Sequence, residues 1–231
     1  MPIVLWIIFW HFWLFYIRTL YVMNLKWVVL RVRIPKEIEK TPKAMQQIFS
    51  AAYSLYSHGL RFSEEYWDGM VEAWASFESA GYSGGVSFYI RCIDRYRNLF
   101  ESAVYAQYPD AEIDLVEDYT NLLPAVIPNK TYDLWGTDVV LTRDDAYPIR
   151  TYPYWEALVT EEKVDTMATL LEVMSKLKEG EMVWLQILIR MTKNTDENWK
   201  KKAEKLRDRL VSKEQAPKSK GVGYIFDKGS E

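Results

Sequence analysis

The pattern of apolar and polar positions begins with a long apolar segment at the N-terminus. Residues 3–23 contain 18 apolar residues out of 21, and the exceptions are His11, Arg18 and Thr19. A helix of this length spans about 30 Å, which is the thickness of the hydrocarbon core of a bilayer. A secretory signal peptide would carry basic residues before this segment and small residues at a cleavage site after it, and neither is present. We therefore expect a transmembrane helix over residues 1–23, with a buried helix of a soluble domain as the alternative.

Basic residues follow the apolar segment closely, and none precedes it. The positive-inside rule then places the N-terminus outside the cell and the rest of the chain in the cytoplasm. Lysine and arginine side chains near the helix end are attracted to anionic lipid headgroups. We expect the following residues to contact the membrane surface: Lys26, Arg31, Arg33, Lys36, Lys40 and Lys43.

Three tryptophans of the apolar segment, Trp6, Trp10 and Trp13, share one helix face with Ile17 and Leu20. Tryptophan in membrane helices is usually found at the membrane–water interface. A tryptophan stripe near the middle of a span indicates packing against another helix. We therefore expect a membrane-helix partner or a homo-oligomer at this face, in addition to the lipid.

Residues 24–120 alternate between strand-like and helix-like patterns. The expected elements are a strand at 26–34, a helix at 41–57, strands at 70–79 and 86–92, a helix at 94–107 and a strand at 111–118. A glycine-containing turn at 82–85 joins the two central strands. The order β-α-β-β-α-β is typical of a ferredoxin-like domain. The expected fold class is therefore α+β, with the membrane helix in front of a ferredoxin-like unit.

Residues 121–212 predict a second, smaller α/β unit. The expected elements are a strand at 131–142 interrupted at Gly136, a helix at 167–177 followed by Gly180 in a left-handed cap, a strand at 182–191 and a helix capped by Thr195. The nearly continuous apolar run at 182–191 is typical of a strand covered on both faces. Residues 213–231 are rich in Lys, Gly and Ser, and predict a flexible basic tail or linker.

Composition and charge narrow the function further. An apolar fraction of 49 % excludes an intrinsically disordered chain, and a single cysteine excludes an internal disulfide. The net charge of −3 separates into +1 for residues 1–25, +4 for 26–43, −12 for 44–192 and +4 for 193–231. Phosphate backbones repel the acidic centre. We therefore expect the acidic core not to bind nucleic acid. A DNA-contacting accessory module is one alternative function.

Motifs of well-known enzyme classes are missing from the sequence: a phosphate loop, zinc-ligand spacings and a nucleophile elbow. Cys92 ends an alternating strand, which favours a small core residue over a nucleophile. One acidic stretch could hold a divalent cation, although its alternation with apolar residues favours a solvated strand face: Asp110, Glu112, Asp114, Glu117 and Asp118. We expect no catalytic, cofactor-binding or metal-ligating residue. An independent membrane-bound enzyme with a pocket between this acidic strand and the aromatic residues 147–155 is the second alternative.

Several segments resemble a family of uncharacterised bacterial membrane-anchored domains. They are RIPKEIEKTPKAM (33–45), FYIR (88–91), YRNLFESAVYAQYPD (96–110), LWG (134–136), YPI (147–149) and GEMVWLQ (180–186). The resemblance covers about residues 20–212. In that family the domain commonly follows a membrane helix and precedes an ATPase similar to type IV secretion coupling proteins and DNA-pumping motors.

The resemblance implies a non-enzymatic domain at the inner membrane that positions or oligomerises a secretion-type or DNA-transfer ATPase. It brings no assigned catalytic residues. Relatives continue into the motor at the point where this sequence ends at Glu231, so the resemblance implies a truncated or stand-alone form.

Overall fold

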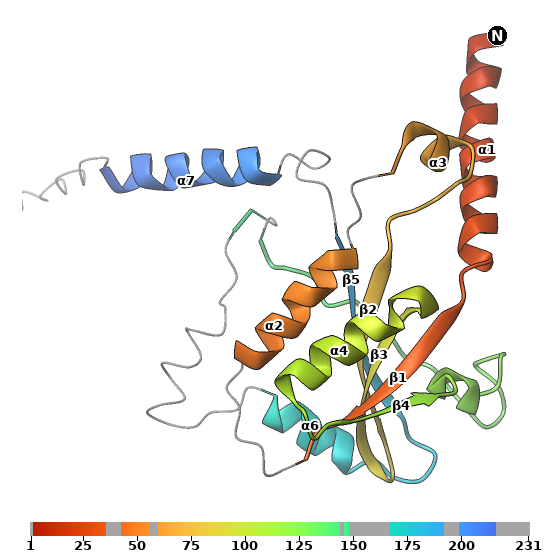
Figure 1. Cartoon of the computed structure of the whole chain (residues 1–231), viewed down its shortest axis with the longest axis vertical. Helices are drawn as coiled ribbons and strands as arrows, with labels where there is room; N and C mark the ends of the chain where they lie inside the picture. Colours follow the sequence, from red (N-terminus) through yellow and green to blue (C-terminus); the bar gives the residue numbers. More distant parts are fainter. Residues whose placement is uncertain are drawn as a thin grey trace, which may run out of the picture. The chain divides into compact units, whose positions relative to one another are not determined.

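The computed structural model describes residues 2–35, 43–55, 60–143, 146–147, 167–191 and 199–215 (Figure 1). Its elements are α1 (Pro2–Met23), β1 (Trp27–Arg33), α2 (Lys43–Ala52), η1 (Tyr53–Leu55), α3 (Phe62–Tyr66), β2 (Trp74–Tyr82), β3 (Gly85–Ile93), η2 (Asp94–Tyr96), α4 (Arg97–Gln107), β4 (Glu112–Val116), η3 (Tyr119–Leu122), α6 (Ala168–Ser175), β5 (Val183–Arg190) and α7 (Trp199–Gln215). The chain divides into two compact units. Met1–Thr137 with Arg150–Lys193 holds the described elements from α1 to β5, and Asp138–Ile149 with Asn194–Glu231 holds α7.

The first unit contains a five-stranded sheet in the order β4-β1-β3-β2-β5, in which every neighbouring pair is antiparallel. Figure 1 shows α2 and α4 side by side over one face of this sheet. The prediction of a mixed α+β fold behind an apolar N-terminal helix is confirmed. From β1 to β4 the strands, α2 and α4 follow the chain in the order strand, helix, strand, strand, helix, strand, with the short α3 before β2.

The core lies between the sheet and the pair α2 and α4. Leu30 on β1, Cys92 on β3 and Phe100 on α4 are fully buried there. They come from the apolar face of each alternating strand and from the helical stripe of α4, as the sequence pattern indicates. Burial raises the pKa of the Cys92 thiol to about 12, which leaves it protonated and unreactive at neutral pH. Cys92 is therefore a small core residue.

The segment between α2 and β2 folds back on itself, which the sequence pattern does not show. The expected strand at 70–79 begins only at Trp74. The backbone N–H groups of Trp67 and Asp68 both donate to the Ser63 carbonyl, and that of Met70 donates to the Glu64 carbonyl. These local hydrogen bonds end α3 in a turn. Since a backbone N–H bonded locally is not free for a sheet, the strand starts after the turn.

The prediction of a strand at 131–142 is wrong, because residues 131–141 have no regular secondary structure. The side chain of Asn129 accepts hydrogen bonds from the backbone N–H groups of Thr131 and Tyr132, both at 2.8 Å. The Asp133 carboxylate accepts from the N–H of Leu134 at 2.9 Å. Short polar side chains thus satisfy the donors that a strand would offer to its neighbour.

The strand expected at 182–191 forms as β5, in a different setting from the one expected. It pairs with β2 over its whole length, with Gln186 opposite Glu78, and so extends the sheet of residues 24–120. It is an edge strand whose Ile187 and Leu188 are exposed, so the expectation of cover on both faces is not met by the described residues. An apolar run marks a strand, but it does not show which edge the strand joins.

The helix before β5 packs closely on the sheet. A Cβ atom built on Gly81 of β2 would lie 2.9 Å from both Cβ and the carbonyl oxygen of Met174 in α6, so only glycine fits there.

Gly180 has a φ of +86°, the left-handed conformation expected of it, although α6 already ends at Ser175. The first residues of the expected tail at 213–231 belong to α7, which runs to Gln215. The rest of the tail lies outside the described residues, as do the expected helix cap Thr195 and the expected helix start at residue 41.

Candidate functional site

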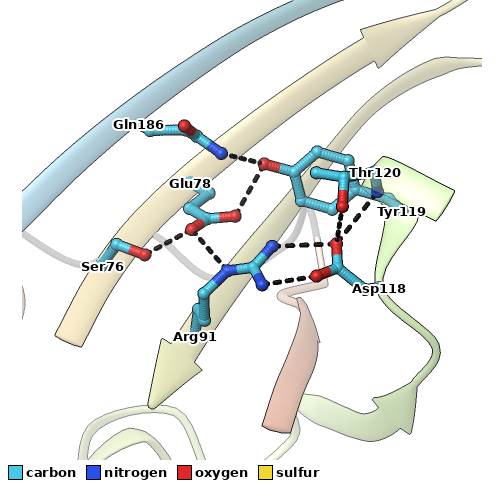
Figure 2. Close-up of polar contacts among 7 residues, drawn as sticks. All are labelled: Ser76, Glu78, Arg91, Asp118, Tyr119, Thr120 and Gln186. Atoms are coloured by element: carbon cyan, nitrogen blue, oxygen red, sulfur yellow. Dashed lines mark hydrogen bonds and ion pairs between the residues drawn. The ribbon is translucent and has the colours of Figure 1, made fainter. Parts of the chain in front are cut away.

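The sheet face away from α2 and α4 carries a connected set of polar side chains (Figure 2). The register places Ser76 opposite Arg91 and Glu78 opposite both Tyr89 and Gln186, and residues opposite each other in antiparallel strands share a face. The alternation along β2, β3 and β5 therefore gathers these polar groups on this face. We name this set the polar network; it is a candidate functional site, because charged groups gathered in a fold are often functional.

Glu78 is the most deeply buried charged residue of the polar network, with only 4 % of its surface exposed. Its carboxylate accepts hydrogen bonds from the hydroxyl of Ser76, from Nε of Arg91 at 3.0 Å and from the hydroxyl of Tyr119 at 2.6 Å. A buried carboxylate without such partners would be strongly unfavourable. The three donors and the positive charge of Arg91 compensate for its burial.

Arg91 also binds Asp118, which lies just before η3. Its two terminal nitrogens each donate to one carboxylate oxygen, with a distance of 2.9 Å from Nη2 to Oδ1. Asp118 in addition accepts from the backbone N–H and the hydroxyl of Thr120, at 2.9 and 2.7 Å. The hydrogen bond from Arg91 lowers the pKa of Asp118 to about 2, and the bond to Asp118 raises the pKa of Arg91. Asp118 therefore caps η3 and fixes it to β3.

Tyr119 connects η3 to two further strands. Its hydroxyl donates to Glu78 of β2 and accepts from Nε2 of Gln186 of β5 at 2.8 Å. Its ring stacks on Tyr89 and meets the edge of Trp184, with centroid distances of 4.8 and 5.3 Å. Burial, with the hydrogen bond to Glu78 next in importance, raises the pKa of Tyr119. The phenol is therefore neutral at physiological pH.

The polar network stabilises the sheet, because its charged groups bind one another. Glu78 and Asp118 share the single cation Arg91, and the hydroxyl of Tyr119 already has a donor and an acceptor. A general base or a nucleophile needs a side chain that can reach a substrate. Within the described ranges, no group of three or more His, Cys, Asp or Glu residues could hold a metal ion. The network therefore joins η3 to the strands β2, β3 and β5.

The acidic stretch considered for a cation site separates in the structure. Asp114 pairs with Arg31 at 3.0 Å and Glu112 pairs with Arg33 at 3.3 Å, across the β1–β4 register. The hydrogen bonds from Arg31 and then Arg33 lower the pKa of Asp114. Asp118 belongs to the polar network. Asp110 and Glu117 are also described, and neither they nor the other acidic residues join a possible metal-binding group.

The residues expected at the membrane surface have varied positions. Lys26 pairs with Asp94 at 3.1 Å, while Arg31 and Arg33 pair with β4. Lys43 is exposed at the start of α2, and Lys36 and Lys40 lie outside the described residues. The pairing could have been anticipated from the sequence. A basic strand followed by an acidic strand of the same alternation favours an antiparallel pair with opposite charges facing each other.

The tryptophan face of α1 meets a segment of its own chain. The ring of Trp10 stacks on that of Tyr66 in α3 at 5.9 Å, and Nε1 of Trp13 donates to the Tyr66 carbonyl at 3.3 Å. Trp6 is exposed and stacks on Trp10. Arg18 pairs with Glu65 at 3.2 Å. The pattern of apolar positions does not predict this contact, because the five residues of α3 are too few to show a helical period.

Gly69 permits the close approach of α1 and the turn after α3. Its φ is +65°, and a Cβ atom there would lie 2.5 Å from the carbonyl carbon of Ile17 and 2.6 Å from its oxygen. Only glycine combines this backbone conformation with this lack of space. The two backbones therefore touch directly, and the region from Arg61 to Met70 and α1 form one packed structure, which we name the α1–α3 contact.

Comparisons with protein-family models, with curated proteins and with solved structures found no match to this chain. The structural evidence on function therefore comes from the geometry of the chain itself. Its main features are an apolar helix long enough to cross a membrane, the α1–α3 contact beside it, and a sheet face on which the polar side chains bind one another.

Replacing Arg91 with methionine removes the cation that binds Glu78. We expect the free energy of unfolding to fall by about 3–5 kcal/mol, because a buried carboxylate is left without a counter-charge. Arg31→Met is the matched control and should cost much less, since its partner Asp114 is exposed to solvent. Urea titrations in detergent measure both. Adding Glu78→Gln to Arg91→Met should restore part of the loss, and equal losses from the two single changes would contradict the assignment.

The low pKa of Asp118 makes stability depend on pH. A carboxyl with a pKa of about 2 in the folded state, against about 3.9 in an unfolded chain, stabilises the fold above that higher value. This contribution is lost as the pH falls towards about 2. We expect wild-type stability to drop over this range and Asp118→Asn to lack this component of the drop. Thermal unfolding followed by circular dichroism measures it, and identical pH profiles would contradict the prediction.

Substituting Gly69 with alanine should release α3 from α1, because the new Cβ has no space beside Ile17. Trypsin cleavage after Arg61, at the start of α3, should then become faster, as followed by mass spectrometry. Gly84→Ala is the control, since a Cβ there meets nothing closer than 4.0 Å. Cleavage at the same rate in both variants would show that the α1–α3 contact does not depend on Gly69.

Proposed function

We propose that this chain is a non-enzymatic, membrane-anchored domain that positions or oligomerises an ATPase of the secretion or DNA-transfer type. In this proposal α1 crosses the inner membrane once, with its N-terminus outside, and the α+β unit lies in the cytoplasm. We further propose that β1–β4 with α2 and α4 make a ferredoxin-like unit, to which β5 adds a fifth strand. The order of these elements along the chain and the strand order β4-β1-β3-β2 support this topology.

The observation that carries the proposal is the exposure of α1. It is long and apolar enough to cross a membrane, and only 6 % of its most apolar window of 18 residues is buried. A core helix of a soluble domain would be covered by its own fold, whereas large exposed apolar surfaces mark contacts with membranes or partners. The exposure of α1 therefore favours the membrane helix over the buried-helix alternative.

The connection between α1 and the sheet supports an anchoring role. α1 ends at Met23 and β1 begins at Trp27, so only three residues separate them. The Asp94 N–H donates to the Lys26 carbonyl within this connection, at 2.8 Å. A linker this short cannot let the domain move far from the end of the helix. If α1 crosses the membrane, this short connection supports a position of the α+β unit close to the membrane surface, where a positioning domain would act.

The ATPase partner rests on the resemblance of residues 20–212 to domains that precede such motors. Exposed apolar side chains on the edge strand β5, Ile187 and Leu188, provide surface for oligomerisation. The acidic strand does not favour the enzyme alternative, because Glu112 and Asp114 are engaged by arginines. The net charge of −12 over residues 44–192 likewise does not favour the DNA-contacting module.

The proposal predicts two separable activities. The full chain should float with lipid vesicles in a density gradient, and a variant lacking residues 2–23 should stay in the soluble fraction. After cross-linking in native membranes, the full chain should capture a protein with a phosphate loop, identified by mass spectrometry. A control of residues 1–26 fused to an unrelated soluble domain should float but capture no such protein. Failure to float contradicts the anchor, and capture of no ATPase by the full chain contradicts the positioning role.

A further inference from the structure

We propose that the α1–α3 contact and the full insertion of α1 into a bilayer exclude each other, so that α3 leaves α1 when the helix crosses the membrane. In this proposal the α3-bound chain is the form that precedes insertion, and the contact is a conformational device that opens on insertion. This inference rests on the proposed anchoring by α1 and adds a change of structure to it. Two features support it: the level on α1 at which α3 is bound, and the charges that α3 carries.

Crossing the hydrocarbon core takes almost the whole of α1. Its apolar stretch, Ile3–Met23, has 21 residues and rises about 30 Å at 1.5 Å per residue. The hydrocarbon core of a bilayer is also about 30 Å thick. When α1 spans the bilayer, the middle of this stretch therefore lies at the centre of the hydrocarbon, and little of the helix remains outside for contacts with the rest of the chain.

α3 is bound at the middle of this stretch (Figure 1). The ring of Tyr66 stacks on that of Trp10, and the Tyr66 carbonyl accepts a hydrogen bond from Nε1 of Trp13. Measured from the start of the apolar stretch, Trp10 and Trp13 lie about 10 and 15 Å along the helix. Gly69 touches the backbone of Ile17 about 6 Å further on. A bilayer spanned by α1 would therefore place a bound α3 inside the hydrocarbon.

The charges of α3 and its flanking residues do not suit the hydrocarbon. Glu64 and Glu65 lie in the first turn of α3, and Arg61 and Asp68, which flank it, are exposed. Among the described residues, Glu65 is the one of these four that forms an ion pair, with Arg18 at 3.2 Å. The other three would enter the hydrocarbon without a counter-charge, where charged groups are strongly unfavourable. At its place on α1, α3 is therefore compatible with water and incompatible with lipid.

α1 loses little when α3 leaves. Arg18 lies five residues before Met23, about 8 Å from the end of the helix, so its long side chain can reach the lipid headgroups without Glu65. Release also breaks the hydrogen bond of Trp13 and uncovers the stacked ring of Trp10, which stays in an apolar environment when lipid replaces α3. Because retention would bring the charges of α3 into hydrocarbon, the balance favours release.

The chain between α3 and the sheet allows this movement. α3 ends at Tyr66 and β2 begins at Trp74, and residues 69–73 have no regular secondary structure. Five residues span up to about 17 Å when they are extended. Opening the turn at Gly69 therefore lets α3 move away from α1 while β2 keeps its place in the sheet.

Two cysteine pairs test this exclusion, since the native Cys92 is fully buried and does not compete for a thiol reagent. Arg18→Cys with Glu65→Cys replaces the ion pair between α1 and α3. Arg33→Cys with Glu112→Cys is the matched control, because it replaces an ion pair between neighbouring strands of the sheet. Each full-length double variant is treated with a short, membrane-permeant bis-maleimide, either in detergent or after reconstitution into phospholipid vesicles. A micelle has no fixed hydrocarbon thickness, so detergent permits the α3-bound form.

Two quantities are measured. The first is the yield of the cross-link in detergent and in vesicles, by mass spectrometry. The second is retention on the vesicles after a wash with alkaline carbonate, which removes proteins that do not span the bilayer. For this measurement, protein cross-linked in detergent is reconstituted beside wild-type protein and protein blocked with a monofunctional maleimide.

We expect the α1–α3 pair to give a much lower yield in vesicles than in detergent, and its cross-linked form to be mostly lost in the wash. The control pair should give equal yields, and its cross-linked form and all blocked samples should stay on the vesicles. An undiminished yield in vesicles, or retention of the cross-linked α1–α3 form, would overturn the exclusion and leave the anchor by α1 intact.

Two further outcomes count against the inference. If the α1–α3 pair gives no cross-link in detergent, the contact is not present before insertion, and the inference fails. If the wild-type chain is itself lost in the wash, the anchor and this inference fail together.

Discussion

The apolar surface of α1 is the constraint on which the rest of the molecule depends. The described residues leave this helix uncovered along most of its length, and water is a poor environment for so large an apolar area. Three local features connect this apolar helix to the rest of the first unit. Glu65 neutralises the single charge of the apolar segment, Gly69 lets the turn after α3 reach the helix backbone, and three residues join the helix to the sheet. Each holds another part of the first unit close to α1.

The polar network stabilises the sheet in addition to its apolar core. One face of the sheet is covered by α2 and α4 and is stabilised by ordinary apolar packing. The other face has a smaller apolar cluster around Tyr89 and Tyr119, and there Glu78, Arg91 and Asp118 provide directional contacts. Such contacts fix η3 and β5 in one arrangement rather than in several. A rigid sheet edge is useful to a domain whose proposed task is to position another protein.

Much of the fold follows from local patterns in the sequence. Strict alternation marks β1, β3 and β4, and a helical stripe marks α4, because each of these elements turns one face towards the core around Leu30 and Phe100. The pattern fails where a local hydrogen bond replaces a regular one, as at Asn129, whose side chain binds two backbone N–H groups of the expected strand. The pattern predicts β5 as a strand but not its neighbour, since the pairing with β2 depends on the whole sheet.

The candidate sites were harder to predict, since they depend on pairs of residues far apart in the sequence. Arg91 and Asp118 are 27 residues apart and Glu65 is 47 residues from Arg18, so no spacing rule connects them. The tryptophan stripe predicts a partner helix or a second copy of the chain, whereas Trp10 and Trp13 contact Tyr66 of α3 in the same chain. The charge pattern of β1 and β4 contained the information for their ion pairs, because oppositely charged strands of one alternation favour each other.

We propose that α1 crosses the membrane and separates the N-terminus from the α+β unit. The most direct test of this proposal is the sidedness of two single cysteines, Ile3→Cys at the start of α1 and Ser83→Cys at the exposed β2–β3 turn, in intact bacterial cells and in inverted membrane vesicles. An impermeant thiol reagent should label position 3 only in cells and position 83 only in inverted vesicles. Labelling of both positions from the same side would contradict the account.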